Sequence, residues 1–152
     1  HIINISSIAA IATAPNMSPY NTTKAAVKAL SETLYSELKE HGISVSVAMP
    51  FFFRTNVLQH ARGQHADSKE MGKYMVHGAK HSADDMAKRL LKKAGAGKFH
   101  ILFPAQAIFL FHLKRLFPMT QLRINAFMST KKEKLREMAK KQYEKQIQKQ
   151  NK

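Results

Sequence analysis

Short apolar runs alternate with longer segments in which apolar residues recur at helical spacing. The runs lie at 2–5, 43–49 and 98–103, and they are typical of buried strands in a parallel sheet. The segments between them carry the spacing of helices that cover such a sheet. The order strand, helix, strand, helix, strand therefore predicts an α/β fold.

The first long helix is predicted to begin at Ser18 and Pro19. A serine N-cap followed by proline at the first helical position is a common helix start. The apolar positions that follow run on to Gly42, which we expect to end the helix. Tyr20 then lies in the first turn, at the positive end of the helix dipole.

Ser7, Tyr20 and Lys24 are the candidate catalytic residues. Ser7 follows the first strand, and open α/β sheets bind ligands at the carboxyl ends of their strands. Tyr20 and Lys24 are four residues apart and share a helix face. A neighbouring cation favours phenolate, so such a tyrosine can give a proton to a carbonyl or take one from an alcohol. The Ser7 hydroxyl can hydrogen-bond the reacting oxygen.

At these positions the sequence resembles the short-chain dehydrogenase/reductase family. The resemblance rests on Asn-Ile-Ser-Ser at 4–7, on Ser-Pro-Tyr-Asn-Thr-Thr-Lys-Ala-Ala at 18–26, and on the strand at 43–49 that leads into Pro50. It covers residues 1–103. It implies that this region is the carboxyl-terminal part of a Rossmann-type, doubly wound parallel sheet.

The resemblance also implies roles for the three residues. Tyr20 would be the catalytic acid and base, Ser7 would orient the substrate and stabilise the developing oxyanion, and Lys24 would lower the Tyr20 pKa and bind the nicotinamide ribose. Ser6 is a competing serine, but its spacing to Tyr20 fits less well than that of Ser7.

The cofactor implied by the family is NAD or NADP. Besides Tyr20 and Lys24, the cofactor contacts that the resemblance implies are Pro50, Phe51, Phe53 through its backbone, and Thr55. Phe51 stands where the family usually has glycine, so a large side chain enters the neighbourhood of the cofactor and positive φ becomes costly there.

The sequence contains no glycine-rich phosphate loop of the G-x-G-x-x-G kind. We therefore expect residues 1–104 to be the carboxyl-terminal half of the domain, without the half that binds adenosine and pyrophosphate. The chain would then be the carboxyl-terminal portion of a longer enzyme and inactive by itself, with an exposed sheet edge at 2–5.

The stretch after Thr55 corresponds to the mobile substrate lid of the family. It brings histidines at positions whose spacing matches no compact zinc pattern, and the chain has no cysteine. We therefore predict no metal site. These histidines are His60, His65, His77 and His81.

A further helix is predicted from Ser82 through Lys93. Ser82 is placed to cap it, with Asp85 as the capping-box partner, and Gly95 and Gly97 follow its end. It corresponds to the last crossover helix of the family, and we assign it a structural role.

Residues 105–129 form a separate apolar, helical extension in this interpretation. The part at 105–117 is densely apolar on one side and bordered by Lys114 and Arg115. It is too short to cross a bilayer. It could cover the substrate cleft, pack at a subunit interface or lie in a membrane surface, with the basic residues toward the headgroups.

Residues 130–152 form a basic tail in which Lys and Arg outnumber Glu by nine to three. Its apolar stripe is narrow, so we expect a solvated helix or a disordered end. The whole chain has a net charge of +15. No nucleic-acid module is recognisable and the tail does not interleave stacking aromatics, which argues against nucleic acid as a partner.

The resulting prediction is an NAD(P)-dependent oxidoreductase that interconverts an alcohol and a ketone or aldehyde, acting on a hydrophobic substrate. A 3-oxoacyl-carrier-protein reductase is one alternative, and a degenerate basic module that binds membrane or nucleic acid is another. The family implies a homo-oligomer that pairs through the helix from Tyr20 to His41. The absence of cysteine is compatible with a cytoplasmic protein, and a membrane-associated one remains open.

Overall fold

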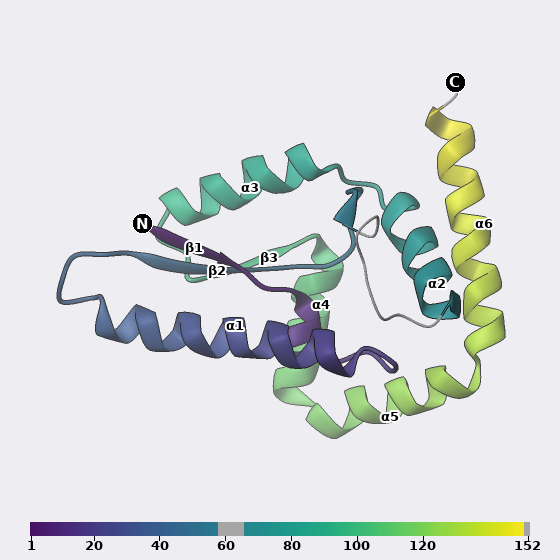
Figure 1. Cartoon of the computed structure of the whole chain (residues 1–152), viewed down its shortest axis with the longest axis horizontal. Helices are drawn as coiled ribbons and strands as arrows, with labels where there is room; N and C mark the ends of the chain where they lie inside the picture. Colours follow the sequence, from purple (N-terminus) through teal and green to yellow (C-terminus); the bar gives the residue numbers. More distant parts are fainter. Residues whose placement is uncertain (58–65, 151–152) are drawn as a thin grey trace.

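The computed structural model describes residues 1–57 and 66–150. Over these residues it confirms the predicted alternation of strands and helices (Figure 1). The elements are β1 (Ile2–Ile5), the short 3-10 helix η1 (Ile8–Ala10), α1 (Ser18–Glu37), β2 (Val45–Pro50), α2 (Ala66–His77), α3 (Ala83–Gly95), β3 (His100–Phe103), α4 (Ala105–Leu116), α5 (Pro118–Thr130) and α6 (Lys132–Gln150).

The described strands form a parallel sheet in the order β1-β2-β3. The central strand β2 is buried along its whole length. β1 was predicted to be buried, but it lies at the edge of the described sheet and is only partly covered, with Ile5 53% exposed. A strand with a neighbour on one side only cannot bury its free edge, so the expected exposed edge at 2–5 is present.

Helices cover both faces of the sheet, with α1 on one side and α3 on the other (Figure 1). Successive residues of β2 point to opposite faces, so Val47 and Met49 pack toward η1 and α4 while Ala48 packs toward α3. The sheet is therefore a two-sided core, as a doubly wound fold requires.

The start of α1 differs from the prediction. The amide of Asn21 donates to the carbonyl of Met17, so Met17 is the N-cap, and Ser18 is already helical and does not cap. Asn16 has a φ of 60° and turns the chain into the helix in the left-handed region. α1 ends at Glu37, earlier than expected, and the turn that follows reaches Gly42, whose φ is 69°.

The predicted capping box at the start of α3 is confirmed. The Ser82 hydroxyl accepts a hydrogen bond from the Asp85 amide at 3.1 Å, and the Asp85 carboxylate accepts one from the Ser82 amide at 3.0 Å. The helix runs to Gly95, and Gly97 has a φ of 71°, which fits a glycine-terminated end.

The carboxyl-terminal region consists of α4 and α5 at 105–130 and α6 beyond them. α6 is not solvated all round, as the sequence suggested, because it packs along α2 and buries Ala139 (Figure 1). Its narrow apolar stripe is enough for this contact, because Tyr74 of α2 and Gly78 just after α2 lie against Tyr143 of α6. No helix of the described residues is long and apolar enough to cross a membrane.

Candidate active site

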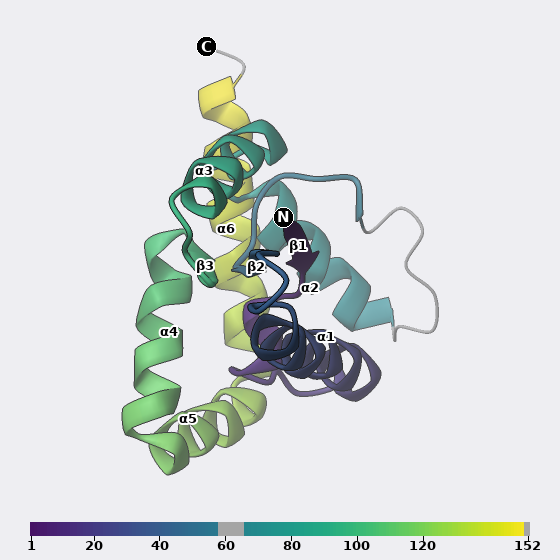
Figure 2. The same cartoon turned by 90° about the vertical axis from the view of Figure 1, so that its left-hand side faces the viewer.

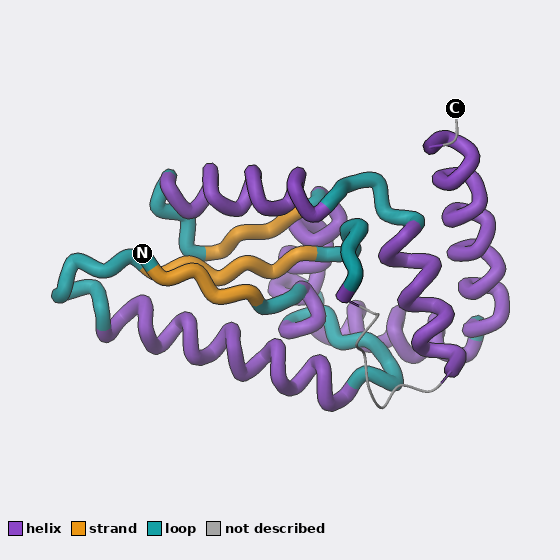
Figure 3. Tube along the Cα trace, turned by 45° about the horizontal axis from the view of Figure 1, so that its top comes forward, coloured by secondary structure: helices purple, strands orange, loops and turns teal. Residues whose placement is uncertain are grey.

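The predicted catalytic residues lie where β1 ends and α1 begins. In a parallel sheet the carboxyl ends of the strands share one edge, and the loops after β1 and β2 leave the sheet at that same end (Figure 3). Ser7 follows β1, and Thr55 follows β2. The fold thus brings the two predicted halves of the site to one side of the sheet.

Lys24 connects the strand and the helix. Its Nζ donates a hydrogen bond to the Ile5 carbonyl at 3.2 Å and lies 5.8 Å from the centre of the Tyr20 ring. Its own backbone carbonyl accepts a hydrogen bond from the Ser6 hydroxyl at 2.7 Å. The ammonium is therefore held between Tyr20 and the end of the strand that carries the serines.

The two candidate serines have different hydrogen bonds. Ser6 is buried, and its hydroxyl proton is used in the bond to the Lys24 carbonyl. Ser7 caps η1, and its hydroxyl accepts a hydrogen bond from the Ala9 amide at 3.2 Å. A hydroxyl that accepts one bond keeps its proton to donate, so Ser7 can stabilise an oxyanion. No hydrogen bond of the described residues joins Ser7 to Tyr20.

Tyr20 is accessible to a substrate, since it is 40% exposed. The first turn of α1 holds no acidic residue, so Lys24 and the helix dipole act on the phenol without an opposing carboxylate in that turn. The loop before the helix is fixed by Asn21, whose side-chain amide donates to the Ala14 carbonyl at 2.9 Å. Asn21 Oδ1 is buried and accepts no hydrogen bond.

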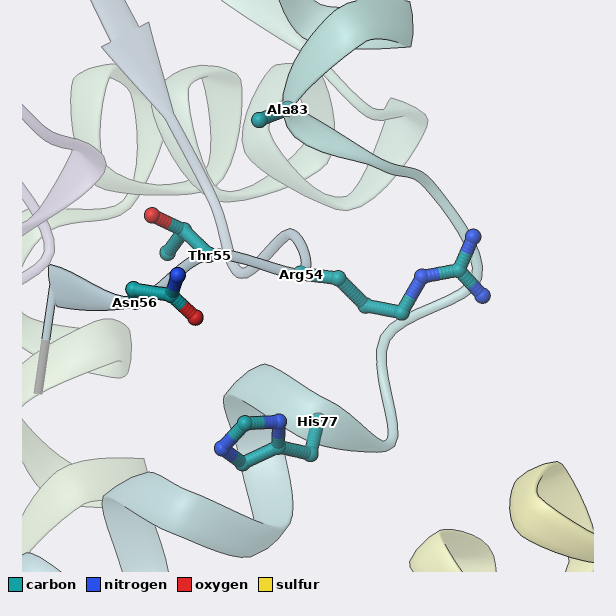
Figure 4. Close-up of a pocket in the computed structure, with 5 residues that line it drawn as sticks. All are labelled: Arg54, Thr55, Asn56, His77 and Ala83. Atoms are coloured by element: carbon teal, nitrogen blue, oxygen red, sulfur yellow. The ribbon is translucent and has the colours of Figure 1, made fainter.

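An open hollow of about 430 Å³ lies beside the segment that follows β2 (Figure 4). Thr55 and Asn56 lie on one side of it, with Ala83 and His77 on the facing segments. The amide of Arg54 donates to the His81 carbonyl at 2.9 Å, which ties this segment to the start of α3. Thr55 is the predicted cofactor residue that lines this hollow.

The other predicted cofactor residues after β2 do not line this hollow. Pro50 is the last residue of the buried strand. Phe51 stands where the family usually has glycine, and its side chain packs against the apolar core. Its ring meets that of Phe52 edge-on, with ring centres 4.8 Å apart. Phe53 is half-buried. Phe51 thus contributes to core packing, and its side chain gives little support to a hydrophobic substrate.

Sequence reasoning did not identify Asn56, His77 and Ala83 as lining residues. Asn56 could have been found, since it adjoins Thr55 at the end of a strand. His77 and Ala83 line the hollow because of where α2 ends and α3 begins in the fold. No local pattern in the sequence indicates this position.

Two of the histidines that were weighed as metal ligands, His60 and His65, lie outside the described residues. The ring of His81 packs on that of Phe103 with centres 4.5 Å apart. Among residues 1–57 and 66–150, no three His, Asp or Glu side chains gather as a metal site would require.

Comparisons with known proteins place this geometry in a family. Residues 1–66 match the short chain dehydrogenase family. The chain also matches the crystal structure of a short chain dehydrogenase/reductase from Burkholderia phymatum in complex with NAD, with 26% identity and a TM-score of 0.68. The match covers 80% of this chain and 48% of that one, so the chain spans about half the length of its structural neighbour.

No curated protein matches the chain. The family match covers β1, α1 and β2 and so includes Ser7, Tyr20 and Lys24, and the structural match covers 80% of the chain. Residues 1–66 are therefore similar to the short chain dehydrogenase family, and the α/β fold of the chain is similar to that of about half of a short chain dehydrogenase/reductase.

Proposed function

We propose that the chain supplies the proton-transfer site of an NAD(P)-dependent oxidoreductase that interconverts an alcohol and a ketone or aldehyde. The observation that carries this proposal is the position of Lys24, whose ammonium lies between the Tyr20 ring and the end of the strand that leads into Ser7. A phenol, an ammonium and a hydroxyl at one sheet edge are the groups that proton exchange with an alcohol requires.

Tyr20 is the proposed general acid and base. In the direction of reduction its hydroxyl gives a proton to the carbonyl oxygen, and in the direction of oxidation the phenolate takes the proton of the alcohol. Lys24 places its positive charge beside the Tyr20 ring, and the Ser7 hydroxyl donates to the oxygen as negative charge develops on it. A nicotinamide cofactor, when bound, supplies or accepts the hydride.

The residues at the sheet edge fit the nicotinamide end of such a cofactor. Thr55 and Asn56 offer a hydroxyl and an amide in an open hollow, and Lys24 can donate to a ribose hydroxyl with the protons that it does not give to Ile5. The sequence holds no glycine-rich loop for the pyrophosphate. We therefore assign these residues to the nicotinamide end alone, and NAD and NADP both remain candidates.

The test compares Tyr20→Phe with Tyr35→Phe in the full-length protein that contains these residues. Both tyrosines lie on α1 and are similarly exposed, at 40% and 44%, so Tyr35→Phe is a matched control. Nicotinamide reduction would be followed with a panel of secondary alcohols and the reverse reaction with ketones and aldehydes. We expect Tyr20→Phe to lower kcat by about 10²- to 10⁴-fold and Tyr35→Phe to leave it unchanged.

Lys24→Met provides a second readout. Its loss removes the cation beside Tyr20 and the proposed donor to the cofactor ribose, so we expect kcat to fall and the KM for the nicotinamide cofactor to rise. Equal activity of the Tyr20 and Tyr35 variants, or a Lys24→Met variant with the kcat and KM of the parent, would contradict the proposed mechanism.

A further inference from the structure

The corner between α4 and α5 presents an apolar tip to solvent. Leu116, Phe117 and Met119 are 67%, 58% and 60% exposed, and they are nearly consecutive in the chain. Figure 2 shows that the two helices meet at an extremity of the molecule, away from the sheet. Large apolar side chains that gather on a protruding corner are typical of a surface that binds another protein or a membrane.

The apolar surface continues onto both helices. α4 anchors itself to the core through Ala107, Leu110 and Phe111, which leaves Ile108 and Phe109 on its outer side. α5 buries only one residue among those described, Gln121, and is apolar around most of its circumference. Its exposed apolar residues are Met119, Leu122, Ile124, Phe127 and Met128.

The charges on α4 and α5 are of one sign. Lys114 and Arg115 form the last turn of α4, and Arg123 and Lys131 lie along and just beyond α5. Residues 86–132 contain no Asp or Glu at all. An apolar surface whose own helices carry cations and no carboxylate is complementary to a surface that offers acyl chains and phosphates together.

A second hollow, again of about 430 Å³, is lined by residues of the last turn of α4, which precede the apolar tip in the sequence. Lys114 and Arg115 line it together with Lys28 of α1, which is paired with Glu32, and with the apolar side chains of Ile11 and Phe111. Cations beside apolar side chains suit the phosphate and glycerol region of a lipid. The hollow therefore places the basic residues where a headgroup would meet them.

We propose that the α4–α5 corner, defined by Ile108, Phe109, Leu116, Phe117 and Met119, docks on the surface of an anionic lipid bilayer. The apolar tip enters the boundary between headgroups and acyl chains, and Lys114 and Arg115 pair with lipid phosphates. None of the described helices could span the bilayer, so the contact is peripheral.

Two features favour a bilayer over a second copy of the chain. The corner is convex, and a deformable lipid surface accepts a protruding tip without a matching groove. A symmetric contact between two copies would also bring Lys114 and Arg115 close to their own equivalents, and like charges at a desolvated interface are unfavourable.

The experiment measures co-sedimentation of the full-length protein with vesicles of phosphatidylcholine alone and of phosphatidylcholine mixed with phosphatidylserine, over a salt series. We expect binding to the anionic vesicles that weakens as salt rises. A Leu116→Ser, Phe117→Ser, Met119→Ser variant should lose most of this binding. The pair Lys114→Gln and Arg115→Gln should weaken it on the order of 10- to 30-fold, because each cation near an anionic surface contributes about 5-fold.

Matched controls lie on α3. Leu91→Ser removes an apolar side chain that is equally exposed, and Lys88→Gln with Lys92→Gln removes the same charge from another basic helix. These variants should bind as the parent does. Equal weakening by the α3 and α4 charge variants, no preference for anionic vesicles, or a serine variant that abolishes self-association and leaves vesicle binding intact would overturn the proposal. Circular dichroism would confirm that each variant is folded.

Discussion

Arg136 of α6 forms an ion pair with Glu70 of α2, joining residues 66 apart in the sequence. The Tyr74 hydroxyl donates to the same carboxylate at 2.6 Å, and the Tyr74 ring lies 5.6 Å from that of Tyr143. α2 ends at His77, which lines the hollow beside Thr55. The carboxyl-terminal helix thus holds in place the helix that borders the candidate site.

Gly78 allows this close approach of α6 to the end of α2. A Cβ at this position would lie 2.6 Å from the Tyr74 carbonyl oxygen and 3.3 Å from the Tyr143 Cα, so backbone would have to move. We expect Gly78→Ala to lower the free energy of unfolding by about 1 to 3 kcal/mol, as overpacking does elsewhere. The measurement is urea denaturation followed by circular dichroism.

Gly95→Ala is the matched control for this substitution. A Cβ at Gly95 meets nothing within 4 Å, and the residue ends α3, so alanine should leave stability unchanged or slightly higher. A Gly78→Ala variant as stable as Gly95→Ala would show that α6 does not pack on α2 as described.

The two serines after β1 should separate in their effects. Ser6→Ala removes a buried hydrogen bond to the Lys24 carbonyl and should cost about 1 kcal/mol of stability, with kcat little changed. Ser7→Ala removes the hydroxyl that can donate to substrate and should lower kcat by about 10²-fold or more. It should also cost about 1 kcal/mol of stability, as Ser6→Ala does, because the Ala9 amide loses its acceptor. Steady-state kinetics and urea denaturation of both variants check this, and the reverse pattern would make Ser6 the catalytic serine.

The features that could be predicted from the sequence are those that depend on residues within one helical turn of each other. Tyr20 and Lys24 share a helix face because they are four residues apart, and Ser82 and Asp85 close a capping box within one turn. The central strand could also be predicted, since β2 carries Val45, Val47, Ala48 and Met49 in a run of six residues. These features need no knowledge of the rest of the chain.

Features that depend on tertiary packing were missed. Met17 takes the N-cap position of α1 that was expected for Ser18, and it follows Asn16, whose positive φ the sequence does not reveal. The contact of α6 with α2 depends on Gly78 and Tyr143, which lie far apart in the sequence and carry no shared pattern. Phe51 packs into the core below the candidate site for the same reason, since the space available to it is set by α4 and η1.

His100 should make stability depend on pH. Its pKa lies below the usual 6.5 because burial disfavours the imidazolium, and because Lys28 repels it more than Glu32 attracts it. The unfolded chain therefore binds the proton more readily, so the stabilising contribution is full above about pH 6.5 and is lost as pH falls below it. Among the described residues, the Nε2 of His100 has no hydrogen-bond partner. This fits a neutral ring packed against Phe111.

His100→Phe keeps an aromatic ring at this position and removes the titration. We expect the free energy of unfolding of the variant to fall less steeply than that of the parent as pH drops through about 6.5, because only the parent gains a proton here on unfolding. Urea denaturation at a series of pH values gives the two slopes, and His41→Phe, an exposed position, is the control. Parallel slopes for the parent and His100→Phe would contradict the assignment.

The capping box of α3 should titrate at lower pH. The Asp85 pKa is lowered from 3.8, chiefly by the hydrogen bond from the Ser82 amide and then by that with the Ser82 side chain. The carboxylate therefore stabilises the fold at pH values above the pKa of the unfolded chain. This contribution is lost as pH falls through and below 3.8. Ser82→Ala should lower stability by about 1 kcal/mol at neutral pH. Asp85→Asn should destabilise at neutral pH, and its difference from the parent should shrink in acid. Asp84→Asn, the neighbouring first-turn acid that does not close the box, is the control, and an acid dependence equal in both variants would remove Asp85 from the cap.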